Sequence, residues 1–156
     1  MFPILIGSFG IGVFIKLVKM EMTKTLDGEL IGEIEFQEDQ IVINEKPYFI
    51  EDIRKIEIIT IDYIGKPITT SIYTTNFDSN RSNGTDNELK MTLNTGENIK
   101  IKFQQEFKDQ ILNEKNTLIK YCNVGKLNYL NLLSILNITE HKEIQEFKKN
   151  NLIQFQ

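Results

Sequence analysis

Apolar and polar side chains alternate most regularly in residues 88–104, on both sides of a polar turn around Gly96. This two-residue period is typical of strands with one face in the core and one in water, so the segment predicts a β-hairpin. A three-residue loop, residues 94–96, pairs Met91 with Ile99 and keeps the apolar side chains on one face, whereas a two-residue loop would mix the faces. It also puts Gly96 where such a loop requires a positive φ.

The chain ahead of the hairpin predicts five further strands. Pairing Phe36 with Ile41 keeps the apolar faces of the first two together. The fourth is apolar on both faces, as expected for a strand that is covered on both sides. A turn at residues 65–67 and a polar loop at residues 78–87 flank the fifth. The five strands are expected at residues 30–36, 41–44, 48–50, 56–64 and 68–77.

Beyond residue 105 the apolar spacing becomes that of helices. Residues 106–122 predict an amphipathic helix that stops near Gly125. Residues 127–136 predict a second helix that is apolar most of the way round, which should therefore be buried. A third helix is expected over residues 140–149, with Thr139 as its N-cap. The side chains expected to point inward include Phe107, Leu112, Leu130, Ile144 and Phe147.

Seven consecutive antiparallel strands followed by one amphipathic helix is an order that few small folds share. It resembles the pleckstrin-homology superfold (PH-like, including GRAM-type domains). The resemblance implies a mainly β protein of the α+β class, in which sheets of four and three strands form a partly open barrel and the helix closes one end. The PH-like domain would span residues 29–123, and residues 124–156 would form a C-terminal helical hairpin. The resemblance rests on element order and not on a signature motif.

The first eighteen residues are the most apolar run of the chain, with Lys16 as their one charge. This length is at the short end of the roughly 17 to 25 residues that cross a bilayer. We expect residues 1–19 to be an inner-membrane anchor and residues 20–28 a linker, with the domain in the cytoplasm because lysines follow the run. The alternatives are a segment buried on the domain and a misplaced start. The residues expected to contact lipid are Phe2, Ile4, Leu5, Phe9, Phe14 and Leu17.

The charge distribution argues against anionic ligands. The formal net charge is −4, and residues 24–62 hold eleven Asp and Glu against four Lys and Arg. Binding of nucleic acid requires a clustered positive surplus, so no nucleic-acid partner is expected. In the PH-like family, phosphoinositides are held by basic residues on and between the first two strands. The matching stretch here, residues 33–40, is acidic, and we do not expect a lipid headgroup there.

The sequence carries no recognisable catalytic or metal-binding motif. Cys122 is the only cysteine and His141 the only histidine, so a disulfide within the chain and a multi-histidine metal site are excluded. We expect Cys122 to be a small buried hydrophobe and His141 a surface residue. The loop at residues 78–88 is rich in oxygen-bearing side chains, but Asn83 and Leu89 stand where a calcium loop requires Gly and Glu. Neither an enzyme nor a cofactor is therefore expected.

These patterns favour a non-enzymatic module that binds or scaffolds another protein, whose identity the sequence does not give. Loops on rigid sheets often carry recognition, so the polar loop is the expected contact. Two alternatives stay open: a barrel that binds a small ligand or is an enzyme of unknown substrate, and a soluble subunit of a larger assembly with an N-terminal interface strand. The expected contact residues are Asp78, Asn80, Arg81, Asn83, Gly84 and Asp86.

Overall fold

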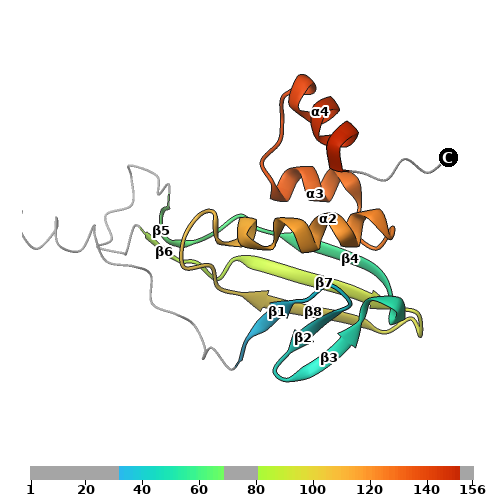
Figure 1. Ribbon diagram of the computed structural model, residues 1–156. Coiled ribbons are helices and arrows are strands. Elements are labelled where there is room, and N and C mark those ends of the chain that lie inside the picture. The colour runs from blue at the N-terminus through green and yellow to red at the C-terminus, as the bar shows by residue number, and fades with distance from the viewer. Residues whose placement is uncertain (1–31, 69–80, 152–156) are drawn as a thin grey trace, which may run out of the picture.

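The computed structural model describes residues 32–68 and 81–151, which form short antiparallel strands followed by helices (Figure 1). The protein is thus α+β, with three open sheets of order β1-β2-β3, β4-β7-β8 and β5-β6. The strands are β1 (Ile34–Phe36), β2 (Gln40–Ile43), β3 (Lys46–Phe49), β4 (Ile53–Ile59), β5 (Ile64–Pro67), β6 (Arg81–Asn83), β7 (Asn87–Leu93) and β8 (Asn98–Phe103). The helices are η1 (Ile50–Asp52), η2 (Gln110–Glu114), α2 (Lys115–Asn123), α3 (Tyr129–Ile135) and α4 (His141–Asn151).

The two hairpin registers expected from the sequence are confirmed. In β7 and β8, Met91 pairs with Ile99, and Gly96 has φ 92° in the turn between them. In β1 and β2, Phe36 pairs with Ile41. Both pairings keep apolar residues on one face of the sheet, which is the reason the sequence could specify them.

The predicted limits of the middle strands are wrong. The fourth strand runs over Ile53–Ile59 and not over residues 56–64. It ends early because the N–H groups of Ile61 and Asp62 donate to the side chain of Asn87 instead of to a neighbouring strand. The turn expected at residues 65–67 lies in β5. The expected polar loop contains β6, and all but the first residue of the strand expected at 68–77 lies outside the described residues.

The predicted distribution of strands between sheets is also wrong. The PH-like resemblance implied a sheet of four strands and a sheet of three, with the fourth strand beside the first three, but β4 pairs with β7. The 3₁₀ turn η1, with Ile50 buried, redirects the chain between β3 and β4. The described residues thus hold eight strands instead of seven, in sheets that do not close into a barrel.

The helices begin later than predicted. The expected helix at 106–122 is the 3₁₀ helix η2 followed by α2. Phe107, which precedes both, has 51% of its surface exposed, so it does not point inward. Leu112 and Leu130 are also exposed, whereas Phe147 is buried as expected. Ile144 packs against the core, as expected. Its N–H donates to the carbonyl of Glu140, so Glu140 and not the predicted Thr139 is the residue at which α4 begins.

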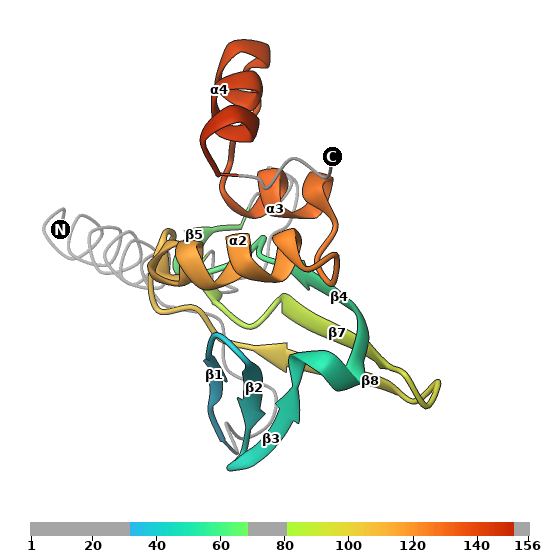
Figure 2. The same cartoon turned by 45° about the vertical axis from the view of Figure 1, so that its right-hand side comes forward.

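The helix α2 is fixed to the first hairpin by a buried tyrosine. The hydroxyl of Tyr121 donates to the carbonyls of Gln37 and Gln40 in the turn between β1 and β2. Burial, together with the carboxylates of Glu114 and Asp39, raises the pKa of Tyr121. In both views α2 and α3 lie on one side of the strands and α4 lies beyond α3 (Figures 1 and 2).

The outer edge of β4 is covered by the chain that follows α2. The N–H of Ile56 donates to the carbonyl of Lys126 at 2.8 Å. The side chain of Asn131 accepts from the N–H of Ile58 at 2.9 Å and donates to its carbonyl at 2.7 Å. Leu127 and parts of α3 and α4 share one hydrophobic core with the strands. This edge of the central sheet therefore has its hydrogen bonds filled from within the chain.

Replacing Asn131 with Ala should lower the free energy of unfolding by about 2 kcal/mol, because both backbone groups of the buried Ile58 lose their partners. Urea denaturation would measure the loss. Asn116, an exposed residue on α2, is the matched control, and Asn116→Ala should change the free energy by less than about 0.5 kcal/mol. Equal transition midpoints for the two variants would contradict the proposed role of Asn131.

None of the helices within residues 32–68 and 81–151 is long and apolar enough to cross a membrane. The predicted anchor at residues 1–19 and the linker at 20–28 lie outside the described residues. The anchor therefore remains a prediction.

Candidate functional site

A cavity of about 750 Å³ lies between β1, β8 and η2. Its volume falls within the range of about 300 to 1,000 Å³ that is usual for ligand pockets. Apolar side chains of β1, β8 and η2 line it, among them Ile34, Phe36, Ile101, Phe103 and Ile111. Charged and amide groups are interspersed with them, including Glu33, Lys102, Gln105, Glu106 and Glu114. We call this cavity the β1–β8 groove.

One wall of the groove is the free edge of β8. The N–H of Leu93 donates to the carbonyl of Glu97. Leu93 and Glu97 are therefore the hydrogen-bonded pair next to the turn of the hairpin. Hydrogen-bonded and open pairs then alternate along an antiparallel ladder. Lys100 and Lys102 fall in open pairs, so their N–H and C=O groups point away from β7. Within the described ranges, no group bonds to them.

The other wall is the free edge of β1. The N–H of Asn44 donates to the carbonyl of Glu33, and the N–H of Gln37 donates to that of Gln40. By the same alternation, Ile34 and Phe36 direct their backbone groups away from β2. No partner for these groups occurs in the part of the chain that the structure describes. The groove is therefore flanked by two strand edges whose hydrogen bonds are unfilled, in contrast to the covered edge of β4.

The charges at the groove that lack a counterion are acidic. Lys102 lies 3.7 Å from Asp86, and Lys100 lies 2.9 Å from Glu88. The ammonium group of Lys100 lowers the pKa of Glu88, with a smaller contribution from Lys90. By contrast, no lysine or arginine among residues 32–68 and 81–151 lies within 4.0 Å of the remaining carboxylates that line the groove, which are those of Glu33, Glu106 and Glu114.

Gln105 supplies an unfilled acceptor beside the groove. The residue is 3% exposed, and its amide nitrogen donates to the carbonyl of Asp62 at 3.0 Å and to the side chain of Asn87 at 3.2 Å. Its amide oxygen has no hydrogen-bond partner among the described residues. A buried acceptor without a donor costs about 1 to 3 kcal/mol.

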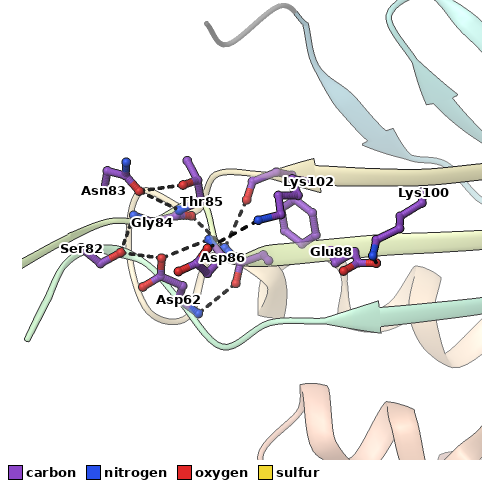
Figure 3. A network of polar contacts seen from close by, with 11 residues as sticks. Asp62, Ser82, Asn83, Gly84, Thr85, Asp86, Glu88, Lys100 and Lys102 are labelled. Atoms are coloured by element: carbon purple, nitrogen blue, oxygen red, sulfur yellow. Dashed lines mark hydrogen bonds and ion pairs between the residues drawn. The ribbon is translucent and has the colours of Figure 1, made fainter. Parts of the chain in front are cut away.

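The polar loop predicted from the sequence folds back on its own chain (Figure 3). A carboxylate oxygen of Asp62 accepts from the hydroxyl of Ser82 at 2.5 Å and from the N–H of Asp86 at 3.1 Å. Asn83 accepts two bonds from Thr85 within the same turn. This network fixes the approach to β7, which is a structural role.

None of the described residues of the expected contact loop lines the groove, although the carbonyls of Asn83 and Gly84 accept bonds from Gln104 and Gln105, which do. Of the six expected contact residues, Arg81, Asn83, Gly84 and Asp86 belong to β6 and the network, and Arg81 donates to the carbonyl of Gly65 at 2.9 Å. Asp78 and Asn80 lie outside the described residues. Contact of this loop with a partner remains a prediction.

The described residues do not bring together a metal-binding cluster. No group of three or more His, Cys, Asp and Glu side chains is placed to hold a metal within these ranges. His141 lies exposed at the start of α4, as the sequence predicted. Cys122 is partly buried, and burial raises the pKa of its thiol, which is therefore uncharged and a poor nucleophile.

The groove was not identified from the sequence. The stretch at residues 33–40 was recognised as acidic, but only the structure puts Glu33 beside β8. Comparison of the chain with protein-family models, with curated proteins and with solved structures found no match.

Proposed function

We propose that this protein is a non-enzymatic, PH-like binding module that holds an extended segment of another protein. The observation that carries the proposal is the free edge of β8, where the backbone groups of Lys100 and Lys102 point away from β7 beside the β1–β8 groove. A segment that adds to such an edge gains affinity from main-chain hydrogen bonds and specificity from pockets for alternate side chains. The β1–β8 groove offers both.

The order of elements supports the PH-like part of the proposal. Antiparallel strands are followed by η2 and α2, and Tyr121 joins α2 to the turn between β1 and β2. In this proposal the sheets β1-β2-β3 and β4-β7-β8 are the two walls of a partly open barrel. The β1–β8 groove is its open seam, and η2 lies at one end of it.

Peptide selection followed by a backbone-specific variant would test the function. Extended peptides are selected from a display library on the purified full chain, and their affinities are compared for wild type, Lys102→Pro and Lys102→Ala. Because the N–H of Lys102 points away from β7, proline removes the outward donor without removing a bond of the β7–β8 ladder. Lys102→Pro should weaken binding about tenfold, as expected for one lost hydrogen bond of about 1.4 kcal/mol.

Lys102→Ala is the matched control, because it removes the charge and keeps the N–H. It should bind the selected peptides within about threefold of wild type, since an exposed charge contributes little. Equal losses in the two variants would assign binding to the side chain and overturn strand addition. Failure to select any peptide would overturn the proposal as a whole, provided that thermal melts show all three proteins folded.

A barrel that binds a small molecule is the second candidate, favoured by the volume of the groove. Native mass spectrometry of the purified protein distinguishes the two. A retained molecule of fixed mass that selected peptides displace would favour this candidate. An unmodified chain mass would leave the protein-binding function preferred.

Residues 1–19 complete the proposal as a tether to the inner membrane, on the strength of an eighteen-residue apolar run with one charge. Deleting residues 1–19 should move the protein from the membrane fraction to the soluble fraction. Full-length protein that is already soluble without detergent would overturn the tether, without consequence for the groove.

A further inference from the structure

We infer that the segment held in the groove is cationic on one face and apolar on the other, and that it pairs with β1 and β8 at once. This inference rests on the proposed function and specifies the partner. The bound segment would join the two sheets in the order β3-β2-β1-segment-β8-β7-β4.

The pairing with two strands follows from the two free edges. Ile34 and Phe36 direct their backbone groups outward from β1, and Lys100 and Lys102 direct theirs outward from β8. Residues from both edges line the same cavity. A strand presents N–H and C=O groups alternately to its two sides. A segment in the groove can therefore form backbone hydrogen bonds with both edges, whereas a segment added elsewhere to one sheet can bond to only one of them.

The apolar face follows from the floor of the groove. Both strands direct apolar side chains toward the hydrophobic core, β1 through Ile34 and Phe36 and β8 through Ile101 and Phe103. Neighbouring residues of one strand point to opposite faces. Every second side chain of the inserted segment would thus meet this floor, where an apolar side chain is favoured.

The cationic face follows from the charges on the outer side. Glu33 and Glu35 flank Ile34 in sequence and lie on the opposite face of β1, without a lysine or arginine within 4.0 Å in the described part of the chain. The lysines of β8 are already paired with Glu88 and Asp86. Opposite charges on neighbouring strands stabilise a sheet and like charges destabilise it. Lys or Arg at the outward positions of the segment therefore complements the acidic side.

The charges of the groove also make other possible occupants less favourable than a basic segment. Anionic lipid headgroups and acidic peptides would be repelled by Glu33, Glu106 and Glu114. A second copy of this chain would bring its own acidic first strand against the same carboxylates. A basic segment of a partner protein is the occupant that the groove complements.

Three capped eight-residue peptides would test the charge. Each alternates Val with Lys, Thr or Glu, and binding to the full chain is measured by calorimetry at low and high salt. The Lys peptide should bind at least tenfold more tightly than the Glu peptide, with a smaller ratio at high salt. In a Glu33→Gln/Glu35→Gln variant the ratio should fall below about threefold, whereas Glu97→Gln, in the exposed hairpin turn, should leave it unchanged.

N-methylated peptides would test the two edges without altering the protein. One Lys peptide is methylated on the backbone nitrogens of its odd residues and another on those of its even residues, so that each loses the donors of one side. Both should bind at least tenfold more weakly than the parent. If one set is tolerated, the segment pairs with a single edge and the two-edge inference is overturned.

The remaining outcomes separate this inference from the proposed function. If library-selected peptides bind in a manner sensitive to Lys102→Pro but prefer no charge, the cationic segment is overturned and the binding module stands. If Lys102→Pro dissociates a dimer of the chain, the occupant is a second copy. If deletion of residues 1–28 strengthens peptide binding more than tenfold, the occupant is the chain's own N-terminal part, and either result overturns a partner segment.

Discussion

Replacing Gly84 with Ala is expected to lower the free energy of unfolding by about 3 kcal/mol, through a left-handed backbone and steric overlap combined. Gly84 has φ +79°, and a Cβ there would lie 2.5 Å from the carbonyl oxygen of Gln105 and 2.6 Å from the nitrogen of Ile64. Those two atoms are hydrogen-bonded to each other at 2.9 Å. They cannot move apart to admit a methyl group without straining the bond that joins β5 to the end of β8.

Gly96→Ala is the matched control, because Gly96 also has a positive φ but no atom within 4 Å of the position of a Cβ. It should cost about 1 kcal/mol, which is the backbone term alone. Urea denaturation of both variants measures the difference. Equal losses would mean that the neighbours of Gly84 yield easily and that the close approach of Gln105 contributes little.

The parts of the fold that the sequence could predict are those decided by neighbouring residues. The β7–β8 hairpin is one: its alternation and Gly96 fix both the turn and the pairing of Met91 with Ile99. The helices after residue 114 are another, because an apolar spacing with turn residues between them is a local signal. In the hairpin, a register shifted by one residue would have exposed a whole apolar face.

The parts that could not be predicted depend on residues far apart in the chain. The PH-like resemblance implied that the fourth strand lies in one sheet with the first three, whereas Ile56 of β4 pairs with Met91 of β7. Its outer edge is covered by Asn131, 73 residues away from Ile58. An asparagine in a predicted helix gives no sign that its side chain will bond to a distant strand.

The groove illustrates the same limit for the candidate site. The sequence marked the stretch around Glu33 as acidic, and it singled out the polar region around Gly84. It could not show that β1 and β8 end as unpaired edges beside one cavity, because an edge is defined by which strands are missing from its side. The unfilled oxygen of Gln105 is likewise visible only once its neighbours are in place.

Replacing Asn87 with Ala should lower the free energy of unfolding by about 3 kcal/mol or more, because several buried groups lose their partners at about 1 to 3 kcal/mol each. Asn87 is fully buried at the start of β7. Its oxygen accepts from the N–H groups of Ile61 and Asp62 at 3.0 and 2.9 Å. Its nitrogen donates to the carbonyl of Gly84 at 2.8 Å.

The control for Asn87 is Asn98, at the exposed end of β8, whose side chain accepts a single bond from the hydroxyl of Thr92. Asn98→Ala should cost less than about 1 kcal/mol, since water can replace that bond. Urea titrations of both variants at the same pH give the comparison. A loss at Asn87 no larger than that at Asn98 would show that water reaches the backbone groups of Ile61 and Asp62, and that the side chain of Asn87 does not terminate β4.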